Sequence, residues 1–237
     1  MIFRSTLRLL LPLALAGCAS GNNQALTTFL SAKDPVARFA GMEEDMLNIY
    51  RLTVNFEVSS TGLIATYLTG KLVVHRDNRV DLNASGILAG DSVTLRLESD
   101  GTRMTGGNGE QSFDQETPKA LSEAIVVGLT RMGILHNLAR LAAGLPPDHS
   151  EGGVKEWVKL DSLRNPDVEG GPNPDLLYNL IVSGEHSASG RLWLMYGDLP
   201  KRRMLRVEFP EGTMDVMETY DCDMERSLEE KRRLRQR

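Results

Sequence analysis

The residue with the clearest chemical prospect is Cys18, whose thiol stands at the end of a short leader. Arg4 and Arg8 make the start of the chain basic, and the apolar run 9–16 follows them. This run has about eight residues, too few to span a bilayer. It ends in the small residues Ala16 and Gly17, directly before the cysteine. A basic segment, a short apolar segment and small residues in this order predict a cleaved signal peptide.

Residues 15–18, Leu-Ala-Gly-Cys, resemble the lipobox of bacterial lipoproteins. The resemblance implies cleavage before Cys18 and acylation of its thiol. Residues 1–17 would then be the signal peptide and residues 18–34 a lipidated tether that holds the body at the membrane. Ala19 favours the outer membrane, with the body in the periplasm, because lipoproteins kept at the inner membrane often carry aspartate at that position. The alternative is an ordinary secretory cleavage site beside an incidental cysteine.

Other residue types that support catalysis or metal binding lack the spacing that such sites need. The four histidines form no His-x-x-x-His pair, and there is no Cys-x-x-Cys pair. The glycine cluster 106–110 has no helix opening behind it and no lysine, so we expect a mobile loop rather than a phosphate site. A Gly-x-Ser-x-Gly motif is absent, and its nearest counterpart at 187–190 connects two predicted strands. We therefore expect no cofactor, no metal and no enzyme, with an envelope hydrolase as the second alternative because paired carboxylates can come from distant segments.

Charge and cysteine content narrow the range of partners. The formal net charge of −5 becomes −7 when residues 1–17, with their two arginines, are removed. Such an acidic body argues against binding to nucleic acid. With Cys18 committed to lipid, Cys222 has no partner for an intramolecular disulfide. The neighbouring carboxylates Asp221 and Asp223 should disfavour its thiolate.

Hydrophobic periodicity predicts an N-terminal helix followed by a run of short strands. Asp34 can cap a helix that begins at Pro35, and apolar spacing extends this helix over 35–50. Period-two alternation between turn residues then predicts an antiparallel meander. Its six strands are expected at 52–59, 63–68, 71–76, 80–84, 93–98 and 102–105.

The most distinctive predicted element is a long helix that begins at Thr117-Pro118 and stops at Gly144. Its polar residues fall on one narrow stripe and the rest of its circumference is largely apolar, so other structure must cover it. It is either a core helix that closes one face of the sheet or a lid over an apolar cavity. Further strands are expected near 157–160 and at 177–183, 190–196, 204–209 and 214–220, before a charged helical tail at 224–237.

This order of elements resembles the LolA/LolB-like superfamily of periplasmic lipoprotein carriers and outer-membrane lipoprotein receptors. Residues 70–74 through 97–102 resemble the family's strand with a following Ser-Asp-Gly turn, and residues 191–194 with 199–203 resemble its later pair of strands. The likeness covers residues 35–220. It implies an α+β, mainly β fold, in which a curved antiparallel half-barrel sheet is covered by helices and holds lipid or acyl chains between them.

The sequence therefore predicts one half-barrel domain over 35–223 in an outer-membrane-anchored lipoprotein. Its expected function is to bind or pass an apolar ligand, such as an acyl chain, a lipid or a lipoprotein, with other envelope proteins as possible partners. A ligand-free structural or assembly lipoprotein is the alternative. The residues expected to line the cavity come from the long helix and from two facing strands: Val93, Leu95, Leu97, Leu121, Ile125, Leu129, Met132, Leu135, Leu192 and Leu194.

Overall fold

The computed structural model describes residues 35–148, 158–164, 176–182, 188–195 and 199–226. The chain separates into two compact units, 1–34 and 35–237, and every described residue belongs to the second. The predicted signal peptide, lipidated Cys18 and tether therefore lie outside the described residues, as do His149 and His186. Among the helices of the described part, none combines the length and the apolar character needed to cross a membrane.

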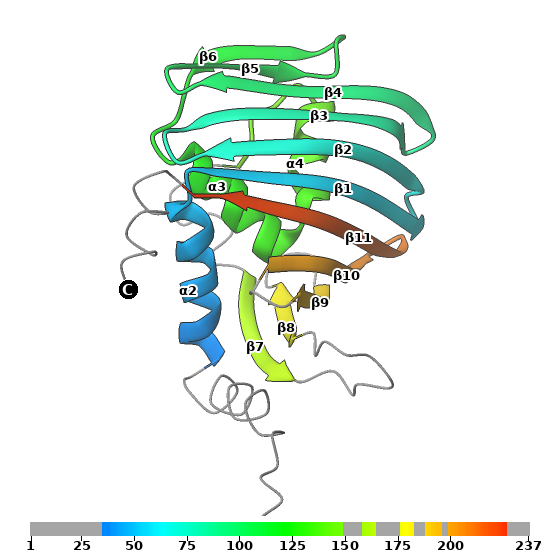
Figure 1. Ribbon diagram of the computed structural model, residues 1–237. Coiled ribbons are helices and arrows are strands. Elements are labelled where there is room, and N and C mark those ends of the chain that lie inside the picture. Colours follow the sequence, from blue (N-terminus) through cyan, green and yellow to red (C-terminus); the bar gives the residue numbers. More distant parts are fainter. Residues whose placement is uncertain (1–34, 149–157, 165–175, 183–187, 196–198, 227–237) are drawn as a thin grey trace, which may run out of the picture. The chain divides into compact units, whose positions relative to one another are not determined.

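One antiparallel sheet dominates the described part of the chain and confirms the predicted mainly β, α+β class (Figure 1). The order of its strands is β6-β5-β4-β3-β2-β1-β11-β10-β9-β8-β7, so the first and last strands of the chain pair with each other inside the sheet. The sheet is open, with β6 and β7 at its edges. Its strands are β1 (Arg51–Gly62), β2 (Thr66–His75), β3 (Arg79–Leu88), β4 (Asp91–Asp100), β5 (Arg103–Gly107), β6 (Ser112–Glu116), β7 (Val158–Arg164), β8 (Leu176–Val182), β9 (Ala188–Met195), β10 (Leu199–Phe209) and β11 (Gly212–Glu225).

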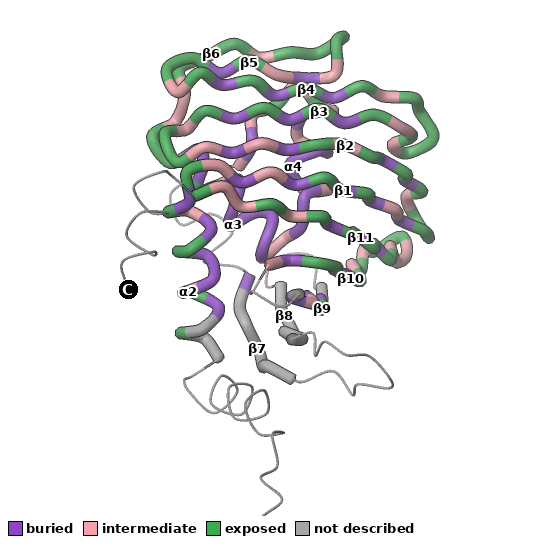
Figure 2. The backbone as a smooth tube through the Cα atoms, in the orientation of Figure 1, coloured by how far each residue is buried: buried purple, intermediate pink, exposed green. Residues whose placement is uncertain are grey.

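Alternating burial explains why these segments are strands. Leu52, Val54, Phe56 and Val58 of β1 are buried, whereas the residues between them are exposed or half-buried. Figure 2 shows the same alternation along β2, β3 and β4. Because successive side chains of a strand point to opposite faces, the buried rows share one side of the sheet, which we call the inner face. The other side is the outer face.

The N-terminal helix is present as predicted and is α2 (Pro35–Asn48). Phe39, Met42, Glu43 and Met46 are its buried side chains among those described before residue 48. Their spacing of three and four residues places them on one stripe of the helix. With this stripe, α2 contributes to the core, and the helix packs against α3 and β7.

The long helix predicted between 117 and 144 is wrong as a single element. The structure has α3 (Leu121–Val127), a π-helical turn η1 (Gly128–Met132) and α4 (Ile134–Ala142), with Gly133 between the last two. We call residues 121–142 the helical segment. It lies against the inner face, where α3 contacts β2 and α4 contacts β4 and β5 (Figure 1).

Two predicted turns in the first half of the sheet are also wrong. β1 continues through 60–62, and the chain turns at 63–65 instead. β2 then runs without interruption through Gly70, where two separate strands were predicted. A Cβ atom at Gly70 would crowd the backbone of Asn83 and lie 2.5 Å from the ring of Phe56, so the glycine makes room for the neighbouring strand and that ring rather than ending a strand.

The glycine cluster is part of the sheet rather than the predicted mobile loop. Gly106 and Gly107 end β5, and the chain returns as β6 after a short turn. A Cβ atom at Gly106 would lie 2.7 Å from the ring of Phe113, its partner on β6. The side-chain oxygen of Asn108 accepts the backbone N–H groups of Glu110 and Gln111 at 2.9 and 2.7 Å, which fixes the turn. Gly106 thus allows a ring to cover the strand.

The second half of the chain contains the later strands that the sequence predicts; four of them are longer than predicted, and β8 is shifted by one residue. β11 continues to Glu225, so the helical tail predicted from residue 224 begins as a strand. Residues 227–237, the rest of that tail, lie outside the described part. Met224 packs against the core, which gives this end of β11 a reason to stay in the sheet.

Candidate ligand-binding site on the inner face

All ten residues predicted to line a cavity belong to one hydrophobic core cluster or pack against it. Val93, Met132 and Leu135 are partly buried and pack against the same hydrophobic cluster that contains the other seven. Leu129, near the middle of the helical segment, is only 1% exposed. In this arrangement the helices occupy the inner face with their own side chains. The buried members of the set are Leu95, Leu97, Leu121, Ile125, Leu129, Leu192 and Leu194.

Gly133 interrupts the helical segment and lets a carboxylate cap the helix behind it. Its φ of 91° is unfavourable for other residues, and a Cβ atom there would lie 2.2 Å from Oε2 of Glu218. Glu218 accepts the backbone N–H groups of Ile134 at 3.1 Å and Leu135 at 2.9 Å. The first N–H groups of a helix have no partner inside it, and they form the positive end of the helix dipole. Glu218 on β11 therefore caps α4.

Arg203 binds the carbonyl groups on the other side of the same break, at the end of η1. Its Nη1 donates to the carbonyl oxygen of Thr130 at 3.1 Å, and its Nη2 donates to the carbonyl oxygen of Arg131. Carbonyl groups at the end of a helix lack partners within it and form the negative end of the dipole. Arg203 on β10 lies directly opposite Glu218 on β11. One pair of facing strand residues thus caps both helix ends at the break.

Tyr220 completes this cluster, which we call the break clamp: Arg203, Glu218 and Tyr220. The Tyr220 hydroxyl donates to Oε2 of Glu218. Burial raises the pKa of Glu218, while Arg203 and the hydrogen bonds to the carboxylate act in the opposite direction. Burial, with the charge of Glu218, raises the pKa of Tyr220 well above its usual value, so the hydroxyl keeps the proton that it donates. Burial lowers the pKa of Arg203, and the nearby Tyr220 and Glu218 oppose this effect.

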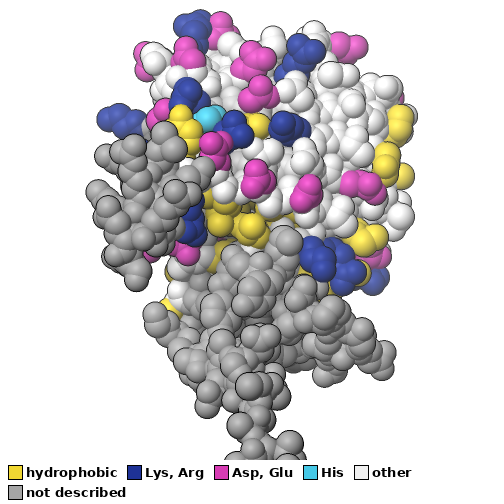
Figure 3. Space-filling model, viewed as in Figure 1, with side chains coloured by type: hydrophobic (Ala, Val, Ile, Leu, Met, Phe, Trp, Pro, Cys, Tyr) yellow, Lys and Arg dark blue, Asp and Glu magenta, His cyan; other side chains and the backbone are white. Residues whose placement is uncertain are grey.

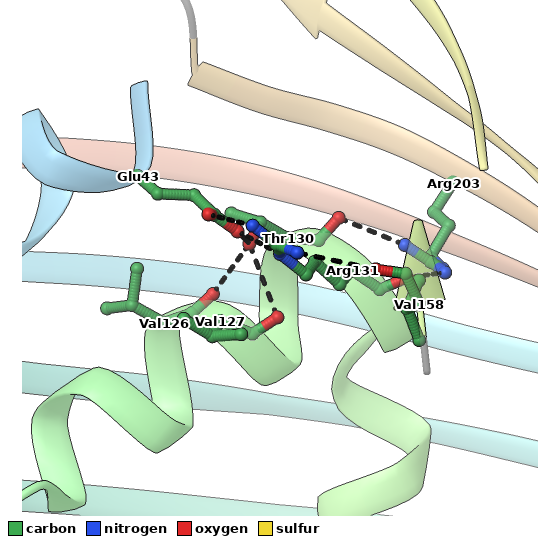
Figure 4. A network of polar contacts seen from close by, with 7 residues as sticks. All are labelled: Glu43, Val126, Val127, Thr130, Arg131, Val158 and Arg203. Carbon is green, nitrogen blue, oxygen red and sulfur yellow. Dashed lines mark hydrogen bonds and ion pairs between the residues drawn. The ribbon is translucent and has the colours of Figure 1, made fainter. Parts of the chain in front are cut away.

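A second polar contact ties the π-helical turn to α2 (Figure 4). The buried carboxylate of Glu43 accepts Nε and Nη2 of Arg131 at 2.8 and 2.7 Å and the hydroxyl of Thr130 at 2.7 Å. Arg131 also donates from Nη1 to the carbonyl oxygen of Val158 on β7 at 3.3 Å. The guanidinium lies 5.6 Å from the centre of the Phe39 ring, a cation–π distance. α2, η1 and β7 are therefore joined at Arg131.

The sequence reasoning did not identify Glu43, Arg131, Arg203 or Glu218. A signal for Glu218 lies in its own strand, where Val216 and Tyr220 belong to the buried row of β11 and Glu218 falls between them. A charged residue on the apolar row of a strand is rarely buried without a partner. That position therefore predicts a polar partner across the core, but it does not say which one.

The outer face carries a different chemistry. Arg79 pairs with Asp77 at 2.9 Å, and Arg103 pairs with Asp114 at 2.6 Å. Figure 3 shows acidic and basic side chains interspersed over this face. A depression of about 420 Å³ on it is lined mostly by polar and charged residues, which does not suit an apolar ligand. Its lining comprises Val73, His75, Arg79, Val80, Asp81, Glu98, Ser99, Asp100, Arg103 and Thr105.

Two further titratable side chains, His136 and Cys222, are partly buried. Burial lowers the pKa of His136, although Asp148 at 3.8 Å acts in the opposite direction, and the lowered pKa favours the neutral imidazole. The thiol of Cys222 donates to the carbonyl oxygen of Pro200 at 3.4 Å. Burial, together with Asp221, raises its pKa to about 12. Among the described residues, no group of three or more histidine, cysteine or acidic side chains is placed to hold a metal ion.

Comparison with known proteins returns similar structures and no similar sequences. No protein-family model matches the chain, and no curated protein matches it significantly. LprF from Mycobacterium bovis has 8% identity and a TM-score of 0.39, and the match covers 83% of this chain and 97% of that one. A DUF1329 family protein from Desulfovibrio piger has 11% identity and a TM-score of 0.31, with 83% and 95% covered.

A third matching structure is a LolA superfamily protein from Nitrosomonas europaea. Its identity is 6% and its TM-score 0.29, and the match covers 82% of this chain and 94% of that one. The superfamily that the sequence resembles is thus among the matched structures. All three TM-scores lie below 0.5, so nothing about the ligand or the activity of this chain follows from these matches.

Proposed function

We propose that this chain is a lipid-anchored protein of the bacterial envelope whose body holds an acyl chain between the inner face of the sheet and the helical segment. The acyl chain would belong to a lipid or to a lipoprotein. Acylated Cys18 would hold the protein at the outer membrane, with the body in the periplasm. The proposal includes no catalytic step, and it assigns the chain a role in binding or passing its ligand.

The observation that carries the proposal is that the helical segment meets the sheet through aliphatic side chains, while polar contacts hold it at only a few positions. The helical segment presents aliphatic side chains to an aliphatic sheet face, and such surfaces accept hydrocarbon as readily as they accept each other. Polar contacts hold the helical segment near its middle, through Arg131, Arg203 and Glu218. They also hold its two ends, where Ser122 donates to the carbonyl oxygen of His75 at 2.6 Å and Asn108 donates to that of Ala142 at 2.9 Å. The stretches between these points face the sheet with apolar side chains, and an acyl chain would enter there.

In the structure the helices are seated on the inner face of the sheet. A bound acyl chain would replace contacts that Leu121, Ile125 and Leu129 now make with the sheet. π-helical turns inside α-helices occur frequently at functional sites. The turn η1 carries Leu129 and lies beside the break at Gly133, so it marks the place where the helical segment can change its course.

One observation favours the alternative of a ligand-free structural lipoprotein. Leu121, Ile125 and Leu129 are exposed by only 0%, 2% and 1%, as in an ordinary filled core. If that is their whole role, Leu129→Ala should lower the free energy of unfolding by about 2 to 5 kcal/mol. The protein should then bind no apolar probe.

The decisive measurement is binding of a fluorescent fatty acid to the purified body, followed by fluorescence anisotropy. We expect saturable binding that Leu129→Trp weakens at least about tenfold, because the larger ring takes the volume of the acyl chain. Ile87→Trp is the matched control, since it introduces the same ring at a position that is 43% exposed on β3. Absence of binding by the unaltered protein would eliminate the carrier function in favour of the structural one.

A further inference from the structure

Arg203 is a buried cation, and one of its three side-chain nitrogens makes no hydrogen bond to the described residues. Its side chain is 1% exposed, and Nη1 and Nη2 donate to the carbonyl oxygens of Thr130 and Arg131. Its Nε is buried and has no hydrogen-bond partner among the described residues. Buried donors are nearly always paired, so an unpaired one at a candidate site indicates a missing acceptor.

Glu218 does not supply that acceptor, although it lies opposite Arg203 on the neighbouring strand. Its carboxylate accepts the backbone N–H groups of Ile134 and Leu135 and the hydroxyl of Tyr220. These three donors orient the carboxylate toward the start of α4. The Nε–H group of Arg203 is therefore left without an acceptor in the described part of the chain.

The surroundings of Arg203 on the other side are aliphatic. Leu192 is its directly opposite partner on β9, and Leu205 is the next inward residue of β10. Leu192 and Leu194 are fully buried, and both belong to the set predicted to line the cavity. A guanidinium next to a wall of leucine side chains matches the two halves of an amphiphile, an anionic head and a hydrocarbon tail.

We infer that Arg203 binds the anionic head of the ligand, so the ligand is an amphiphilic lipid with a hydrocarbon tail and a carboxylate or phosphate head, rather than the ester- or amide-linked acyl group of a lipoprotein. This inference rests on the proposed function and specifies the class of ligand that the site accepts. The Nε and Nη2 groups on one side of a guanidinium form a fork that a carboxylate or phosphate can accept with two oxygens. Both anions are stronger acceptors for a guanidinium than the neutral carbonyl oxygen of Arg131 that Nη2 now contacts.

The test compares three ligands with the same hydrocarbon tail as competitors of the fluorescent fatty acid: palmitate, palmityl phosphate and palmityl alcohol. We expect the anionic ligands to displace the probe at concentrations about tenfold or more below that of the alcohol, because only they make charge-assisted hydrogen bonds. The difference between palmitate and palmityl phosphate then identifies the preferred head. Equal displacement by all three ligands overturns the inference and leaves the proposed function standing. Failure of the probe itself to bind removes the proposed function.

Two variants assign the preference to Arg203. Arg203→Met should abolish the difference between palmitate and the alcohol while binding of the alcohol persists. Arg202→Met is the matched control, because Arg202 is the exposed neighbour on β10 whose guanidinium lies 4.2 Å from the centre of the Trp193 ring. If Arg203→Met does not fold, Arg203→Lys keeps a cation without the fork and should reduce the preference. If a folded Arg203 variant keeps the preference for anionic ligands over the alcohol as fully as Arg202→Met does, the inference is contradicted. The ligand series on the unaltered protein tests the inference without any variant.

Discussion

At the scale of single residues, Glu218 is unusual because its carboxylate is buried. A carboxylate that is 1% exposed has lost its water, and it is stabilised by two backbone N–H groups, a tyrosine hydroxyl and the charge of Arg203. Removal of one partner from such a cluster leaves the others buried and unpaired. The clamp is therefore sensitive to the protonation of Glu218.

The pH dependence of stability should reveal this carboxylate. Because burial raises the pKa of Glu218 above the ordinary 4.5, the folded chain binds its proton more tightly than the unfolded chain does. The resulting contribution to stability is fully present below pH 4.5 and is lost as the pH rises through the folded pKa. We expect the melting temperature of Glu218→Gln, measured over a pH series, to lack this part of the decline.

Glu57→Gln is the control for that series, since Glu57 is an exposed residue of β1. It should keep the slope of the unaltered protein. Parallel pH profiles for Glu218→Gln and the unaltered protein would show that Glu218 is not the titrating group.

At the scale of elements, the break in the helical segment should depend on the glycine at its centre. Gly133→Ala forces a side chain into a backbone conformation with φ of 91° and against Oε2 of Glu218. Backbone strain alone costs about 1 to 3 kcal/mol, and loss of the cap on α4 adds to it. Gly90→Ala separates the two effects, because Gly90 has φ of 95° and no atom within 4 Å of the added Cβ. Chemical denaturation should show a larger loss for Gly133→Ala, and equal losses would contradict the capping role of Glu218.

The secondary-structure elements also show how much of this fold the sequence can predict. Period-two alternation identifies the region of nearly every strand because it reports burial directly, as in Leu52 to Val58. Gly70 and Gly106 mislead because a glycine that ends a strand and one that makes room for a ring, here of Phe56 or Phe113, look alike in sequence. The break at Gly133 was missed for a similar reason, since its partners Arg203 and Glu218 come from distant strands. The burial of the apolar residues is thus predictable from local pattern, and the partners within the break clamp are not.

At the scale of the whole molecule, anchoring should depend on Cys18 and not on the body. Cys18→Ser should move the protein out of the membrane fraction or leave it with the mass of the uncleaved chain. Several acyl chains anchor a protein firmly, and the variant has no thiol to carry them. Cys222→Ser is the matched control and should stay in the membrane fraction, since Cys222 belongs to the body. Fractionation with mass measurement of both variants checks this expectation. An unchanged location and mass for Cys18→Ser would rule out the lipobox interpretation.

The position of the break clamp in the sequence also determines the order in which parts of the protein can fold during synthesis. Glu218 lies 84 residues after Ile134, and Arg203 lies 73 residues after Thr130, so the helical segment leaves the ribosome long before the groups that cap its break. β1 likewise waits for β11, the last strand of the sheet. Contacts this distant in sequence form slowly, because a long loop must close first. Until the final hairpin arrives, the nascent chain keeps an uncapped helix break and an open strand edge, so the last strands decide when the protein is finished.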